Sequence, residues 1–215
     1  MRIRNVFSSL LCALVFILGL GSASTVSAEK IKVLIIDGQN NHNWKKTTEA
    51  TRATLLSSGR FTVDVSTSPG NKKDKAAWEA WNPDFSKYAV VLSNYNDGGR
   101  CVWSEKMKKS FVDYIAGGGG FVVVHAADNS SGDWPEYNRM IGVGGWGGRK
   151  PGHGSHLRLV DGQWATDPAP KGGSGSHGPQ HEFVVEIHEP DHPIVRGLPT
   201  KWKHGKDELY DSLRG

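Results

Sequence analysis

The sequence has little cysteine, which limits the covalent and catalytic chemistry open to the chain. Only two of its 215 residues are cysteines, Cys12 and Cys101. Cys12 lies in an N-terminal apolar run, so removal of that run leaves no partner for an internal disulfide. Cys101 precedes a predicted helix without a strand–turn–helix elbow around it, so we expect a loop residue rather than a nucleophile. The chain also lacks a G-x-S-x-G pattern, the usual serine-hydrolase signature.

The sequence lacks a strong excess of charge of one sign. It has 26 basic and 22 acidic residues, for a formal net charge of +4. Its densest basic segment, residues 72–75, is short and contains an aspartate. Nucleic-acid-binding surfaces need longer basic runs or stripes. We therefore expect no nucleic-acid partner.

Long hydrophobic runs are absent except near the N-terminus. Arg2 and Arg4 accompany an apolar run over residues 6–20, and small residues then lead to Ala28. This order is typical of a secretory signal peptide cleaved after Ala28. A membrane anchor is the alternative, but a span needs about 20 apolar residues. We predict a signal peptide over residues 1–28, a mature domain over 29–215 that is periplasmic or secreted, and no stable membrane insertion after cleavage.

Strand-like and helix-like segments alternate along the first part of the mature chain. Short apolar or alternating runs predict four strands, at Ile31–Ile36, Phe61–Val65, Ala89–Ser93 and Phe121–Val124. Helical spacing of apolar residues predicts helices at Trp44–Ser58 and Ser104–Ala116, and a short helix or loop at Lys72–Trp81. This alternation is typical of βαβ units. We therefore expect an α/β fold, a doubly wound, mostly parallel sheet with helices on both faces, of the flavodoxin-like type.

The regular pattern weakens beyond Trp146, where glycine and proline are frequent. Ser155–Val160 and Phe183–His188 read as strands, and Lys206–Leu213 reads as a helical turn. Residues 161–180 show no regular pattern. A loop of this length in a compact domain is usually functional or disordered.

Polar loops follow three of the predicted strands at their carboxyl ends. Residues 37–44, 94–99 and 125–129 are dense in amides, carboxylates and imidazoles. Ligands bind outside the carboxyl ends of the strands in open α/β sheets, and these side chains suit a ligand rich in hydroxyl groups. The alternative is that each loop is only an Asn/Gly turn. We expect the three loops to converge on a binding site.

His125 is the residue that we single out for acid–base catalysis. It follows the apolar strand Phe121–Val124 and precedes two alanines. An imidazole there can exchange protons near neutral pH, with Asp128 or Asp37 to orient it. The alternative is a buried, hydrogen-bonded structural histidine.

A second group of imidazoles lies in the glycine-rich part of the chain. It comprises His153, His156, His177 and His181, and Glu182 follows. His177 and His181 have the spacing of a helical metal pair, but the Gly-Pro between them forbids that helix. Three interpretations stay open: a loop that contacts the substrate, a divalent-metal site held by these four histidines, or plain surface.

Several short motifs together resemble the ThuA-like (trehalose utilisation) family. They are residues 118–128 (GGGFVVVHAAD), Trp134, Tyr137, 140–142 (MIG), 145–149 (GWGGR), 177–178 (HG), 181–183 (HEF), 191–194 (DHPI), 197–199 (GLP) and 207–210 (DELY). The resemblance implies a class I glutamine-amidotransferase-like fold whose nucleophilic cysteine is absent, its place falling at or near His125. It also implies sugar utilisation, linked to trehalose-like disaccharides and their 3-keto derivatives. Some members carry a secreted glycosyl hydrolase label. Family members continue beyond Gly215, so we expect a domain truncated at its C-terminus that lacks the final strands.

These observations give a predicted site and three hypotheses for function. The predicted catalytic residues are His125, Asp128, Asp37 and Glu182. The predicted substrate contacts are Asn40, His42, Asn94, Tyr95, Trp146, Arg149, His177, His181, Asp207 and Glu208. The first hypothesis is an exported enzyme, not a glutamine amidotransferase, that acts on a small carbohydrate by His/Asp acid–base chemistry. The others are a non-catalytic carbohydrate-binding protein and a metal-dependent glycoside hydrolase; no cofactor besides a divalent metal is expected.

Overall fold

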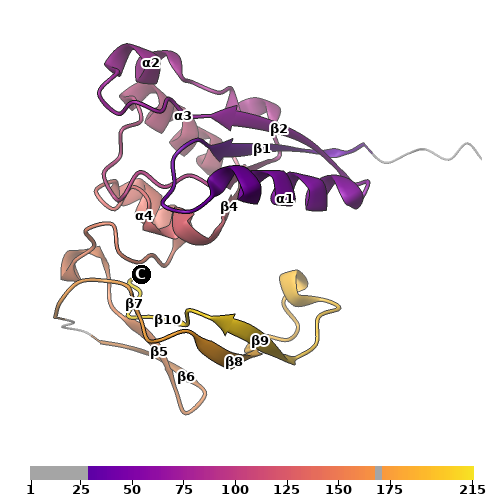
Figure 1. Ribbon diagram of the computed structural model, residues 1–215, viewed down its shortest axis with the longest axis vertical. Coiled ribbons are helices and arrows are strands. Elements are labelled where there is room, and N and C mark those ends of the chain that lie inside the picture. Colours follow the sequence, from indigo (N-terminus) through magenta and orange to yellow (C-terminus); the bar gives the residue numbers. More distant parts are fainter. Residues whose placement is uncertain (1–28, 168–170) are drawn as a thin grey trace, which may run out of the picture.

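A computed structural model describes residues 29–167 and 171–215 (Figure 1). The predicted signal peptide, residues 1–28, lies outside the described residues. In Figure 1 the parallel sheet and its helices occupy the upper half of the view, and antiparallel ribbons occupy the lower half.

Four strands form one parallel sheet in the order β2-β1-β3-β4. They are β1 (Ile31–Asp37), β2 (Phe61–Thr67), β3 (Val90–Ser93) and β4 (Gly120–Val123). The chain runs outward from β1 to β2, then returns to the other side of β1 for β3 and β4. The strand order therefore reverses between β1 and β3, which makes their carboxyl ends the switch point where α/β sheets bind ligands.

Helices cover both faces of this sheet, so the predicted fold class is confirmed. The helices are α1 (Trp44–Ser57), α2 (Lys75–Ala80), α3 (Glu105–Ala116) and α4 (Pro135–Ile141). One face carries Val33 and Ile35, with Leu55 of α1 packed against them. The other carries Leu34 and Ile36, together with apolar side chains of α2, α3 and α4. No helix within the described ranges has the length and apolar character to cross a bilayer.

The starts of α1 and α3 follow from local hydrogen bonding. Asn43 Oδ1 accepts from the backbone of Lys46 at 3.3 Å, and Ser104 Oγ accepts from the backbone of Met107 at 3.2 Å. Each bond satisfies one of the amides that a helix start leaves without a partner.

The second half of the chain is built from short helices and two-stranded antiparallel ribbons. Four single-turn helices occur in the described residues: η1 (Phe85–Lys87), η2 (His125–Asn129), η3 (Pro151–His153) and η4 (Pro193–Val195). The ribbons pair β5 (Leu157–Val160) with β6 (Gln163–Thr166), β7 (Ser176–His177) with β10 (Tyr210–Asp211), and β8 (His181–Glu186) with β9 (Lys201–Asp207).

Two sequence predictions for this half are wrong. Residues 161–180 contain β6 and β7 rather than an irregular loop, because Asp161 and Gly162 both adopt positive φ (49° and 75°) and close a two-residue hairpin. Residues 206–213 are extended rather than helical, because Asp207 pairs with β8 and Tyr210 pairs with β7.

Arg214 forms hydrogen bonds that hold the last residues of the described chain against several glycine-rich segments. Its side chain is 1% exposed and donates to the carbonyls of Gly154 at 2.9 Å and of Gly172 and Gly173 at 3.1 Å. Its backbone exchanges two hydrogen bonds with Gly144, of 2.8 and 2.9 Å. These contacts place β10 near the carboxyl edge of the parallel sheet.

Glycines let the loops at this edge touch through their backbones. A Cβ at Gly147 would lie 2.3 Å from the carbonyl oxygen of Asn129, and a Cβ at Gly99 would lie 2.3 Å from the Cα of Gly147. No other residue type permits such approaches. At Gly148, in contrast, a Cβ would meet open space.

We predict that Gly147→Ala destabilises the protein much more than Gly148→Ala. Both glycines have positive φ, 55° and 75°, so both alanines carry a backbone strain of about 1–2 kcal/mol. Only the alanine at 147 also collides with backbone atoms. Thermal unfolding should show a clearly larger fall in Tm for Gly147→Ala, since each kcal/mol lowers Tm by roughly 2–4 °C at this size. Equal shifts would contradict the close packing of these loops.

Candidate functional site

A pocket of about 450 Å³ lies at the carboxyl edge of the sheet. Its walls come from the loops after β1 and β3, from η2, from the segment around Trp146 and from the β7–β10 ribbon. The residues that line it are Asn41, His42, Asn96, Gly98, Asn129, Trp146, Gly147, His177, Glu208 and Tyr210. The three polar loops that the sequence predicted to meet therefore share one cavity at the switch point.

Two histidines from different strand ends meet beside this pocket. The Nε2 atoms of His42 and His125 lie 3.1 Å apart, and their ring centroids are separated by 4.6 Å. His125 follows β4 almost at once and has a φ of 46°. A non-glycine residue in this left-handed region is strained, and such strain is concentrated at functional sites.

The hydrogen bonds of two asparagine amides determine which nitrogen of the histidine pair is the acceptor. Asn96 accepts from the backbone N–H of Gly98 at 2.8 Å, so its amide nitrogen donates to Asn41 Oδ1 at 2.9 Å. The amide nitrogen of Asn41 must then donate to Nε2 of His42, at 3.2 Å. Nε2 of His42 is therefore an acceptor, and the Nε2–H of His125 donates to it. A further proton would enter this pair at Nδ1 of His125.

The environment shifts the titration of two groups at this edge. Partial burial, and then the neighbouring His42, lower the pKa of His125, against the opposing effect of Asp207 and Glu208. Burial raises the pKa of Asp128 from 3.8 to about 6, and the Arg149 charge opposes this rise. His125 and Asp128 are three positions apart in the sequence, and the pKa of each is shifted from its ordinary value. Such shifts are typical of acid–base sites.

Aromatic rings form one wall of the pocket. The rings of Trp146 and Tyr210 meet edge to face with centroids 4.7 Å apart. The Tyr210 ring also lies 5.7 Å from the ring of His125 and 5.9 Å from that of His177. A wall of rings beside a wall of amides suits a sugar, which presents both C–H faces and hydroxyl groups.

The structure brings some of the predicted site residues to this pocket. His42, Trp146, His177 and Glu208 line it, and His125 contacts His42 at its edge. Besides Gly98 and Gly147, four lining residues were not predicted: Asn41, Asn96, Asn129 and Tyr210. The three asparagines lie in the polar loops, so loop position is the signal that could have found them. Tyr210 reaches the pocket through the pairing of β10 with β7, which no local pattern indicates.

Other predicted residues lie outside the pocket lining and form hydrogen bonds between the elements that carry it. Asp37 is 2% exposed and accepts from the hydroxyls of Thr48 at 2.8 Å and Thr67 at 2.7 Å. Asn94 is equally buried and donates to Thr48 Oγ1 at 3.0 Å. Asn40 Oδ1 accepts from the backbone of His42 at 3.0 Å. These groups connect β1, α1 and the loops. Both carboxylate oxygens of Asp37 accept from hydroxyls outside the pocket lining, so Asp37 is not assigned a catalytic role.

Tyr95 and Arg149 point into the protein, not into the pocket. Tyr95 is 2% exposed among the rings of Trp78, Trp81 and Trp103, and its burial raises its pKa strongly. Arg149 is also 2% exposed, and its guanidinium donates to Ser130, Asn138 and Gly145. The predicted substrate contacts at these two positions are therefore wrong in this structure.

Several predicted residues of the ribbons lie away from the pocket lining. Glu182 forms an exposed ion pair with Lys203 at 2.6 Å, and Asp207 contacts His204 at 3.3 Å. Nδ1 of His181 lies 2.9 Å from the carbonyl of Pro179. Cys101 is half-buried, and burial raises the pKa of its thiol to about 11, in keeping with the expected unreactive role.

The four histidines predicted to hold a metal are engaged separately. Nδ1 of His153 accepts from the backbone of Lys150 at 2.9 Å, and Nε2 of His156 lies 3.3 Å from the carbonyl of Gly173. His177 and His181 each contact a nearby carbonyl. Within residues 29–167 and 171–215, no three His, Cys, Asp or Glu side chains are grouped to hold a metal ion.

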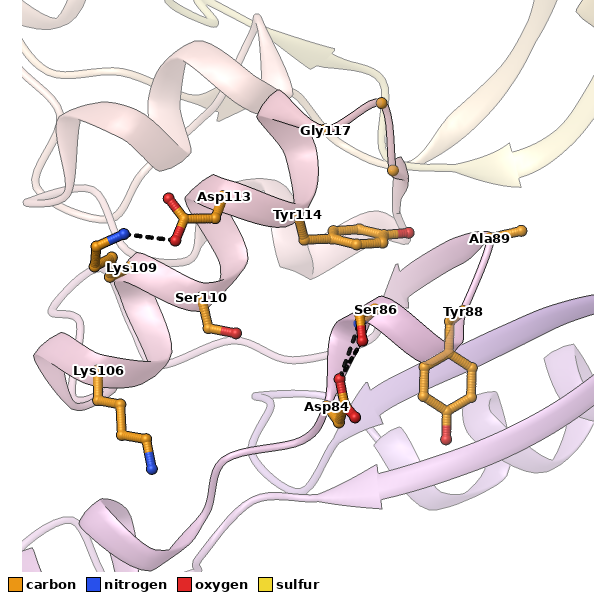
Figure 2. Close-up of a pocket in the computed structure, with 12 residues that line it drawn as sticks. Asp84, Ser86, Tyr88, Ala89, Lys106, Lys109, Ser110, Asp113, Tyr114 and Gly117 are labelled. Atoms are coloured by element: carbon orange, nitrogen blue, oxygen red, sulfur yellow. Dashed lines mark hydrogen bonds and ion pairs between the residues drawn. The ribbon is translucent and has the colours of Figure 1, made fainter.

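A larger hollow, of about 860 Å³, lies at the opposite edge of the sheet (Figure 2). It lies between η1 and α3, at the amino ends of β3 and β4. Within it Lys109 pairs with Asp113 at 2.6 Å and the hydroxyl of Ser86 donates to Asp84. Ligands of α/β sheets bind at the carboxyl edge, so we place the site at the pocket lined by His42 and His177.

The fold and the pocket define the class as doubly wound α/β proteins with a polar, aromatic-walled site at the sheet's switch point. A family model described as ThuA, trehalose utilisation, matches residues 32–214, and the chain belongs to this family. A solved ThuA-like protein from Parabacteroides merdae is 44% identical, with a TM-score of 0.79 over 87% of this chain and 64% of that one. A ThuA-like protein from Bacteroides uniformis shares the fold, at 18% identity and a TM-score of 0.51, over 88% and 64%. This chain thus spans less than two thirds of either protein, and no curated protein matches it.

We predict that Asp128→Asn removes a pH dependence of stability. The pKa of Asp128 is raised from 3.8 to about 6 on folding, so the native state holds the proton more tightly and loses stability as pH rises between these values. The difference should be on the order of 1–3 kcal/mol, measured as the change in free energy of urea unfolding between pH 4 and 7. The exposed Asp191→Asn should keep the wild-type dependence, and an unchanged pH profile for Asp128→Asn would contradict the assignment.

Proposed function

We propose that this protein processes a trehalose-like disaccharide or its 3-keto derivative by acid–base chemistry, with His125 as the general base. The observation that carries the proposal is the 3.1 Å contact between His42 and His125 beside a polar pocket at the switch point. The family description, trehalose utilisation, supports the substrate class.

A carbon next to a ketone can lose a proton to a suitably placed base, because the resulting charge moves to the ketone oxygen. Nδ1 of His125 is the ring nitrogen that remains free to accept, since its Nε2–H donates to His42. The lowered pKa of His125 keeps the ring neutral near pH 7. Asp128, with a pKa of about 6, supplies a second group that gains and loses a proton in the same pH range. A 3-keto disaccharide is therefore a better substrate for this site than an unoxidised sugar.

A second candidate is a non-catalytic carbohydrate-binding protein of the same fold. The observation that favours it is the aromatic wall of Trp146 and Tyr210, whose rings are 4.7 Å apart. Such rings stack on sugar faces without any need for proton transfer. This candidate requires saturable binding of a disaccharide and no product.

We predict that His125→Ala lowers turnover of 3-ketotrehalose by about 100-fold or more, the usual contribution of a general base. His125 is exposed and begins a single-turn helix, so the variant should keep its Tm and its affinity for trehalose. His181→Ala, which changes an exposed ring outside the pocket lining, is the matched control and should retain activity. Unchanged turnover in His125→Ala would refute the role of this residue. Binding without turnover by the wild type would favour the second candidate.

We also propose that the protein acts after export, on the basis of the basic residues, the apolar run and the small residues that end at Ala28. Intact-mass measurement of the exported protein should give a chain that starts at Glu29. Ala28→Phe should block cleavage, because signal peptidase needs a small residue there, whereas Ala23→Phe should be cleaved normally. Retention of residues 1–28 by the wild type would contradict export with cleavage.

A further inference from the structure

Two pairs of titratable side chains approach the pocket from different parts of the fold. His42 and His125 come from the ends of β1 and β4. His177 belongs to β7, where it lies directly opposite Tyr210 of β10, and Glu208 lies in the short segment between β9 and β10. The Nε2 of His177 is 3.6 Å from a carboxylate oxygen of Glu208, and both residues line the pocket.

The contacts of His177 define which of its ring nitrogens carry hydrogen. Nδ1 lies 3.0 Å from the carbonyl oxygen of Gly178. A carbonyl only accepts, so Nδ1 must donate. Nε2 faces the carboxylate of Glu208, which also only accepts when ionised. Nδ1–H of His177 therefore donates to a carbonyl, and Nε2 faces a carboxylate that would attract a proton on that nitrogen.

The contacts of the other pair leave a nitrogen that accepts. The two Nε2 atoms of His42 and His125 are 3.1 Å apart and have room for a single hydrogen between them. The amide of Asn41 donates to Nε2 of His42 and keeps that nitrogen unprotonated. One side of the pocket thus offers an acceptor nitrogen, and the other places an imidazole beside a carboxylate. The ring centroid of Tyr210 lies 5.7 Å from that of His125 and 5.9 Å from that of His177.

We propose that His177 is the proton donor to the leaving oxygen of the disaccharide and that Glu208 is its positioning residue. The assignment rests on the proposed function, which supplies the substrate class. His125 removes the proton on C2, next to the C3 ketone of a 3-keto disaccharide. The electron pair forms a C1–C2 double bond, the bond from C1 to the glycosidic oxygen breaks, and that oxygen takes the Nε2 proton of His177. The products are an unsaturated keto sugar and a free sugar, and the elimination needs no oxidant or reductant.

The two proton transfers can be separated by the choice of leaving group. 3-Ketotrehalose must release a sugar alkoxide, which needs a proton, whereas 4-nitrophenyl 3-keto-α-glucoside releases a phenolate that is stable without one. His177→Ala should lose about 100-fold or more of its kcat on 3-ketotrehalose but stay within about threefold of wild type on the nitrophenyl substrate. His125→Ala should lose activity on both. Glu208→Gln should lose activity selectively on 3-ketotrehalose and move the alkaline limb of its pH–rate profile to lower pH.

The possible outcomes separate this inference from the proposed function. Equal loss by His177→Ala on both substrates would mean a binding or structural role, and no loss on either would mean no role; each result overturns the assignment while leaving His125 in place. A wild type that cleaves neither substrate overturns the proposed function and the assignment with it. His181→Ala, four residues along the chain, should match the wild type on both.

The protonation states can be measured without any substrate. Long-range ¹H–¹⁵N spectra of the imidazole rings of the wild type at pH 7 should show His177 with hydrogen on both nitrogens and His42 with hydrogen on Nδ1 alone. His177→Ala and His42→Ala identify the signals. A singly protonated His177 at this pH would overturn its assignment as the donor, whether or not the variants are active.

Discussion

The buried guanidinium of Arg149 is the interaction on which the pocket depends. It donates through Nε to Asn138 at 2.9 Å, through Nη1 to the carbonyl of Gly145 at 2.8 Å and through Nη2 to that of Ser130 at 3.0 Å. These acceptors belong to α4, to the segment that carries Trp146 and to the loop that follows η2. One cation therefore holds three irregular segments at fixed distances. Its charge also limits how far burial can raise the pKa of Asp128, so the same group affects both the shape of the pocket and its titration.

Arg214 also holds irregular segments together, in the second half of the chain. Irregular segments leave many backbone carbonyls without the partners that helices and strands supply, and buried carbonyls need hydrogen bonds. Arg214 donates to the carbonyls of residues 154, 172 and 173, and its backbone pairs with Gly144. A guanidinium suits this task because it offers five N–H groups in a rigid plane. The glycine-rich composition is the complement of these arginines, since backbone contacts such as that of Gly99 with Gly147 need the Cβ to be absent.

The pocket has one side held by amides and a second, more exposed side formed by a histidine and a carboxylate. His42 is held by the amides of Asn41 and Asn96. His177 lies on the two-residue strand β7 and Glu208 lies just before β10, with side chains 37% and 32% exposed. Partial exposure screens the attraction between them, so geometry rather than strong Coulomb energy keeps the pair together. A polar, hydroxyl-rich ligand that excludes water from this side would strengthen the pair.

The sequence by itself determined the strands of the parallel sheet, the helices α1 and α3, and the three polar loops, because apolar periodicity is a local property. It also indicated His42 and His125, since strand ends can be read from the chain. Only the tertiary structure decided which side chains of these loops face outward. Asp37 and Arg149 turned inward because buried hydroxyls and carbonyls needed their partners. Tyr210 and Glu208 reached the pocket through the pairing of β7 with β10, a contact between distant segments that no local pattern encodes. The contact of His42 with His125 spans 83 positions, and it exists because parallel strands end at the same edge.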